Sequence, residues 1–110
     1  MASVRYEWIR LGRAIGTTGW ADNIITDTVG AGGTLTVTTS ATTAGNRPVA
    51  PASGKVGELY ARLTAIDGPV HVEKGIDPTA TLTNGLRLVP NLPEVLAVSP
   101  GDKLSFIGEA

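Results

Sequence analysis

The stretch ELYARLTAI, at residues 58–66, decides the fold class of this chain. Apolar and polar side chains alternate along it, which is typical of a β-strand with one buried and one exposed face. Turn-forming residues occupy positions 67–69, and a second alternating stretch covers residues 70–73. We therefore predict two strands joined as a tight β-hairpin. The first strand buries Leu59, Ala61, Leu63 and Ala65, and it exposes Glu58, Tyr60, Arg62 and Thr64.

Similar alternation recurs along the rest of the chain. Between these stretches lie turn sequences such as Asn84-Gly85, which favours a two-residue hairpin loop, and Pro100-Gly101. No helical pattern interrupts the C-terminal half, which argues against a parallel α/β sheet. The sequence therefore predicts an all-β fold, a small antiparallel β-sandwich or barrel that is jelly-roll-like. Further strands are expected over residues 34–38, 86–88, 94–98 and 103–107, and residues 4–8 are expected to form a strand or an extended arm.

The chain divides by composition into two parts. Residues 12–33 are rich in glycine and lack a regular pattern, so we expect residues 1–33 to form an extended, loop-rich N-terminal arm. Residues 34–110 carry the alternating stretches and form the expected β domain. Within that domain, the small polar residues 39–53 indicate a long surface loop.

Composition and charge narrow the function classes. The 110 residues suit one domain, and 42% hydrophobic with 17% charged residues favours a folded chain over a disordered one. The net charge of −1 argues against a nucleic-acid partner, and no apolar run is long enough to span a membrane. With no cysteine and no signal peptide, the chain is expected to be made and assembled in a cytoplasm.

The search for reactive groups finds little. His71, the only histidine, lies two residues from Glu73, but no nucleophile accompanies this pair, and an exposed strand histidine beside a solvated glutamate explains it better. Asp22, Asn23 and Asp27 do not have the spacing of a calcium loop. The glycines at positions 30–33 precede a Thr-rich strand and no lysine, so they indicate a hinge or tight turn, not a phosphate loop. We therefore expect no catalytic residue, cofactor site or metal site, and no enzyme.

The N-terminal arm carries the best candidates for contact with a partner. Three arginines stand against one glutamate in residues 1–13, a net charge of +2, whereas residues 67–110 hold six acidic and three basic residues, a net charge of −3. Aromatic side chains on an arm that a small core cannot cover are typical interface anchors. The expected interface residues are Arg5, Tyr6, Trp8, Arg10, Arg13 and Trp20.

The C-terminal half resembles a known group of proteins. The stretch GPVHVEKGIDPTAT at residues 68–81 is followed by Asn84-Gly85, by Pro93-Glu94 and by PGDKLSFI at residues 100–107. This order of strands and turns is similar to that of small all-β virion proteins of tailed bacteriophages, over residues 56–107. The matching residues are mostly turn formers and strand apolars, and residues 1–33 lie outside the resemblance.

The resemblance implies a capsid decoration or cement protein on the outside of the phage head. Its partner would be the major capsid protein, and it would bridge neighbouring capsid subunits as a homo-oligomer, with a trimer favoured. The arm would reach an adjacent subunit. Two alternatives stay open: a carbohydrate- or receptor-binding module of a phage tail, and a ring protein that completes the head or tail.

Overall fold

The computed structural model describes residues 2–16, 19–52 and 59–109. The described chain consists of strands and their connections, with one short 3-10 helix, η1, at Ala44–Asn46. The strands, in chain order, are β1 (Ala2–Gly16), β2 (Gly19–Thr28), β3 (Gly33–Val37), β4 (Leu59–Ile66), β5 (Val70–Gly75), β6 (Leu86–Leu88), β7 (Glu94–Val98) and β8 (Lys103–Gly108).

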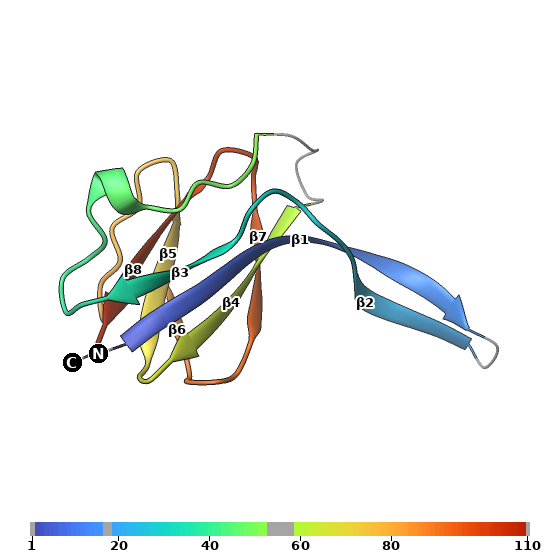
Figure 1. The fold of residues 1–110 in the computed structure, drawn as a ribbon, viewed down its shortest axis with the longest axis horizontal. Coiled ribbons are helices and arrows are strands. Elements are labelled where there is room, and N and C mark those ends of the chain that lie inside the picture. Colours follow the sequence, from blue (N-terminus) through green and yellow to red (C-terminus); the bar gives the residue numbers. More distant parts are fainter. Residues whose placement is uncertain (1, 17–18, 53–58, 110) are drawn as a thin grey trace.

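The strands form two antiparallel sheets that pack as two layers (Figure 1). In the first sheet, β1 pairs with β4, and β4 pairs with β7. On its other edge β1 pairs with both β2 and β3, which follow one another along it. The second sheet has the order β6-β5-β8. The predicted all-β fold is confirmed, and of the two architectures left open by the sequence, sandwich or barrel, the structure has the sandwich.

The core lies between the inner faces of the two sheets. Strand β4 contributes every second residue, and the predicted buried set, Leu59, Ala61, Leu63 and Ala65, is fully or almost fully buried. From the second sheet come Val70, Val72, Leu88, Leu104 and Phe106. Burial of such side chains contributes about 1.5–3 kcal/mol each before conformational entropy is subtracted.

The predicted hairpin between residues 58–66 and 70–73 is wrong in its pairing. Both edges of β4 are occupied, by β1 and by β7, so β5 cannot pair with it. Instead, the turn at Asp67 and Gly68 carries the chain from one sheet to the other, and Asp67 adopts a positive φ of 61° there. The local sequence specifies the reversal, whereas the choice of partner depends on which strand edges remain open.

The Asn84-Gly85 pair does not form a two-residue hairpin loop either. Strands β5 and β6 do pair, with Val72 opposite Leu86, but a loop over residues 76–85 connects them. A Cβ atom on Gly85 would lie 2.3 Å from the carbonyl oxygen of Val72, and φ is +78° at this position. The glycine therefore allows the end of the loop to approach the backbone of β5.

This loop over residues 76–85 covers the outer face of the second sheet. Pro78 and Ala80 are buried, and the Ala80 N–H donates a 3.0 Å hydrogen bond to the hydroxyl of Ser105. Residues 39–52, which the sequence indicates as a surface loop, run along the edge of β8. The Thr42 N–H donates to the Phe106 carbonyl at 3.0 Å, and the Gly108 N–H donates to the Thr38 carbonyl at 2.8 Å.

The N-terminal region differs most from expectation, because its described residues, 2–16 and 19–33, lie mostly in strands and not in a loop-rich arm. Ser3 to Ile9 pair with β4, so the first half of β1 is part of the sandwich. The second half of β1 and the strand β2 form a hairpin that projects from the body (Figure 1). This projection gives the molecule an elongated shape, with extents of 48 × 27 × 23 Å. The division at residue 33 thus falls within one continuous sheet.

A tight connection joins the projecting hairpin to β3. The Val29 N–H donates a 2.8 Å hydrogen bond to the Trp8 carbonyl, which keeps the connection against β1. A Cβ atom on Gly32 would lie 2.4 Å from the Tyr6 carbonyl oxygen. The glycine-rich stretch that suggested a hinge or tight turn is therefore a connection that packs closely against the backbone of β1.

Truncation of the core should destabilise the fold strongly. We expect Phe106→Ala to lower the free energy of unfolding by about 3–5 kcal/mol, because it removes a ring that is fully buried between the sheets. Urea unfolding followed by tryptophan fluorescence measures the change. The exposed Ile76, in the loop after β5, gives the matched control: Ile76→Ala should change stability by less than about 0.5 kcal/mol. Equal effects would contradict this account of the core.

Candidate partner-binding surface

The two aromatic residues expected to anchor a partner in β1 belong to the core instead. Trp8 is only 3% exposed, and Tyr6 packs against the same cluster of buried residues. Their ring centroids lie 5.8 Å apart with the planes tilted by 58°. The alternation that placed Val4, Tyr6 and Trp8 on one face was read correctly, but that face lies against the second sheet. Trp8 is therefore removed from the candidate contact residues.

Two of the predicted arginines lie on the outer surface of the first sheet and its hairpin. Arg5 is exposed. Arg10 forms an ion pair with Asp27, directly opposite on β2, at 3.8 Å. Such an exposed pair contributes about 0–1 kcal/mol, so it holds the hairpin only weakly. The backbones of Arg13 and Trp20 lie in the projecting hairpin, and their side chains are outside the described part of the structure.

The projecting hairpin has pairing described along only one edge of β1. β1 pairs with β2 as far as Gly16, opposite Gly19, whereas its pairing with β4 ends at Ile9. Among the described residues, no strand occupies the other edge of β1 beyond Ile9. An isolated two-stranded hairpin is marginally stable in water. Apolar residues are nevertheless frequent in its sequence, which includes Leu11, Ala14, Ile15, Trp20, Ala21, Ile24 and Ile25.

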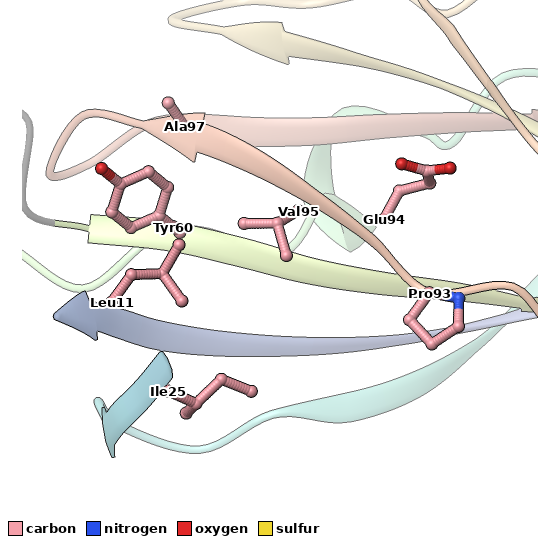
Figure 2. A pocket seen from close by; sticks show the side chains of 7 residues that line it. All are labelled: Leu11, Ile25, Tyr60, Pro93, Glu94, Val95 and Ala97. Atoms are coloured by element: carbon pink, nitrogen blue, oxygen red, sulfur yellow. The ribbon is translucent and has the colours of Figure 1, made fainter. Parts of the chain in front are cut away.

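A shallow apolar groove lies at the base of this hairpin, on the outer face of the first sheet. Figure 2 shows side chains from β1, β2, β4 and β7 beside one another along it. The groove has a volume of about 590 Å³, and Ile25 and Val95 on its walls are each 45% exposed. Glu94 is the one charged residue in its lining. The lining residues are Leu11, Ile25, Tyr60, Pro93, Glu94, Val95 and Ala97.

Sequence reasoning missed this groove because four strands contribute to it. Tyr60 was expected on the exposed face of its strand, and it does lie there, half-buried. Only the sheet order brings Tyr60 next to Ala97 and places both near Leu11. The sequence did contain one signal, because all four residues at positions 95–98 are apolar. A strand with a single buried face needs an apolar residue only at every second position.

The histidine is paired differently from the expectation. His71 is buried rather than exposed, and its Nε2 lies 2.7 Å from Oε1 of Glu109, not beside Glu73. The guanidinium of Arg87 also donates to Glu109, through Nε at 2.6 Å. The hydrogen bond from Arg87, followed by that from His71, lowers the pKa of Glu109 from 4.5 to about 2. This cluster ties the C-terminal residues to β5 and β6.

Of the three residues weighed as a calcium loop, Asp22, Asn23 and Asp27, only Asp27 has a described side chain. Asp27 is used in the pair with Arg10, and the side chains of Asp22 and Asn23 lie outside the description. Within the described ranges, no three His, Asp or Glu side chains gather in a way that could hold a metal ion. The same ranges contain no helix with the length and apolarity to cross a membrane.

Comparison with protein-family models gives no match for this chain. Comparisons with curated proteins and with solved structures give no match either. The function is therefore argued from the residues and the geometry described above.

The Glu109 cluster predicts a specific loss of stability in acid. Because the pKa of Glu109 is lowered in the folded state, its contribution is present above pH 4.5 and is lost as the pH falls towards 2. Glu109→Gln removes the carboxylate, so the thermal midpoint of this variant should fall less between pH 4.5 and pH 2 than that of the natural chain. Calorimetry at a series of pH values measures both curves. Glu94→Gln, the control, removes a carboxylate from the groove, and its thermal midpoint should fall with pH as steeply as that of the natural chain. If the thermal midpoints of Glu109→Gln and of the natural chain fall in parallel, this account of Glu109 is wrong.

Proposed function

We propose that this chain is a structural virion protein that decorates the outside of a tailed-phage head and bridges neighbouring major capsid subunits. The observation that carries the proposal is the hairpin of β1 and β2, which projects from a compact sandwich and has an apolar sequence. A protein that joins neighbouring subunits needs an element that extends beyond its own body, and this hairpin is such an element.

The resemblance of residues 56–107 to small phage virion proteins also supports the proposal. The stretch at residues 68–81 forms β5 and the first part of the loop over the second sheet, and residues 100–107 form the turn before β8 and most of β8 itself. These residues therefore build one sheet and its connections. The resemblance to small phage virion proteins thus concerns the body, while the hairpin is the part that would differ with the shell to which the protein attaches.

The physics of attachment follows from the hairpin. An extended segment that meets an open strand edge gains main-chain hydrogen bonds, and the apolar side chains beside it gain burial. Exposed arginines would pair with carboxylates of the shell. In this proposal the contact residues are Arg5, Arg10, Arg13 and Trp20, whereas Tyr6 and Trp8 stabilise the body. The protein would be located on the capsid surface.

Removing the hairpin tests the proposal. Deleting residues 2–13 would destroy the sandwich, because the first half of β1 lies at its centre. Replacing residues 13–23 by Asn-Gly is better, since Gly12 and Ile24 are already paired and can close a two-residue turn. We expect this variant to keep its far-ultraviolet circular dichroism and to lose binding to DNA-free heads of the phage that encodes it, measured by co-sedimentation.

A surface variant outside the hairpin provides the matched control. Ile76→Ser changes a side chain that is 85% exposed in the loop after β5, and it should co-sediment with heads as the natural chain does. If the natural chain does not bind heads but binds a glycan array, the protein is a recognition module and the proposal is wrong. Undiminished binding of the hairpin-replaced variant would assign attachment to the sandwich instead.

A further inference from the structure

An asparagine followed by a glycine lies exposed at the end of the loop between β5 and β6. Both Asn84 and Gly85 are exposed to solvent. The backbone nitrogen of the residue after an asparagine can attack the side-chain amide, and a glycine offers no side chain to hinder that attack. The other three asparagines of the chain are each followed by a residue with a large side chain: Asn23 by isoleucine, Asn46 by arginine and Asn91 by leucine.

The fold requires the glycine at this position. A Cβ atom on Gly85 would overlap the carbonyl oxygen of Val72 in β5, and φ is +78° there, a conformation that other residues rarely adopt. A bulkier residue therefore cannot replace Gly85 to slow the attack. Any restraint on the reaction has to act on Asn84 itself.

The contacts of Thr81 supply such a restraint. The hydroxyl of Thr81 donates a 2.6 Å hydrogen bond to Oδ1 of Asn84, and the Thr81 N–H donates to the same oxygen at 3.2 Å. In return, the Asn84 N–H donates to the Thr81 hydroxyl oxygen at 3.2 Å. These hydrogen bonds direct the side-chain carbonyl towards Thr81, which precedes Asn84, whereas the attacking nitrogen belongs to Gly85, which follows it.

From these contacts we infer that Asn84 is a site of spontaneous deamidation, and that Thr81 restrains its rate. In the reaction, the backbone nitrogen of Gly85 forms a bond to Cγ of Asn84. The bond from Cγ to Nδ2 breaks, and ammonia leaves with the proton of the Gly85 N–H. Water then opens the five-membered imide at one of its two carbonyl carbons, which gives aspartate or isoaspartate.

The two products differ in what they do to the loop. An aspartate at position 84 keeps an oxygen that can accept from the Thr81 N–H and hydroxyl. Isoaspartate adds a methylene to the backbone beside Gly85, where the chain already lies against Val72 without room for a Cβ atom. The isoaspartyl form should therefore move the end of the loop away from β5.

Ageing of the purified chain tests the inference. Trypsin cleaves after Lys74 and Arg87, so the peptide of residues 75–87 contains Asn84 as its single asparagine, and the peptide of residues 88–103 contains only Asn91. In mildly alkaline buffer, which favours loss of the amide proton, mass spectrometry should find the amide-to-acid mass increase first in the peptide of residues 75–87.

Two substitutions at position 81 separate the restraint from the dipeptide itself. Thr81→Ala removes the hydroxyl, and the rate at Asn84 should rise about twofold to tenfold, which corresponds to the loss of one net hydrogen bond. Thr81→Ser keeps the hydroxyl and should deamidate as the natural chain does. Both variants should keep the far-ultraviolet circular dichroism of the natural chain, since Thr81 lies in a loop outside the core cluster.

The natural chain unfolded in urea gives the unrestrained rate, which should exceed that of the folded chain. Earlier modification of Asn91 than of Asn84 would overturn the assignment of the site. An unchanged or lower rate in Thr81→Ala, or equal rates in the folded and unfolded chain, would overturn the restraint. The inference concerns the loop over the second sheet and does not depend on the proposed function.

Discussion

The pairing of β1 with strands on both of its edges is the constraint on which the rest of this structure depends. Ser3 to Ile9 hydrogen-bond to β4 on one edge, while β3 and then β2 follow the other edge. This arrangement fixes which face of β1 meets the second sheet, and so it places Val4 and Trp8 in the core. The described pairing of β1 with β4 extends to Ile9, opposite Tyr60, and β1 itself continues to Gly16.

The projecting hairpin consists of the part of β1 that is described as paired with β2. Up to Ile9, β1 has neighbours on both edges and a second sheet beneath it, so its apolar side chains are buried. Beyond Ile9 the same chain has one neighbour, β2, and its remaining edge is open in the described structure. The groove at Leu11, Tyr60 and Val95 lies at this change. The proposed function uses this junction, because the hairpin that would reach a neighbouring subunit leaves the body there.

The second sheet shows how polar groups and loops complete a small domain with few aromatic residues. The loop over residues 76–85 covers Ser105 and supplies its hydrogen-bond donor. Glu109 joins the C-terminal end to His71 and Arg87, and residues 39–52 occupy the free edge of β8. Edge strands left open invite pairing with other chains. In the second sheet, these contacts occupy backbone groups along the outer edge of β8.

The sequence by itself determined the all-β class, the position of most strands and the buried face of β4, because side-chain alternation is a local property of an extended chain. It also located the reversals at Asp67-Gly68 and at Pro100-Gly101. Only the tertiary structure decided which strands pair, that Asp67-Gly68 joins two sheets, that Trp8 is a core residue, and that Tyr60 and Val95 share a groove. These properties depend on hydrogen bonds between residues far apart in the chain, and an alternating strand carries no local mark of its partner. The same alternation that identified β1 as a strand could not tell whether its apolar face meets a partner or the protein's own second sheet.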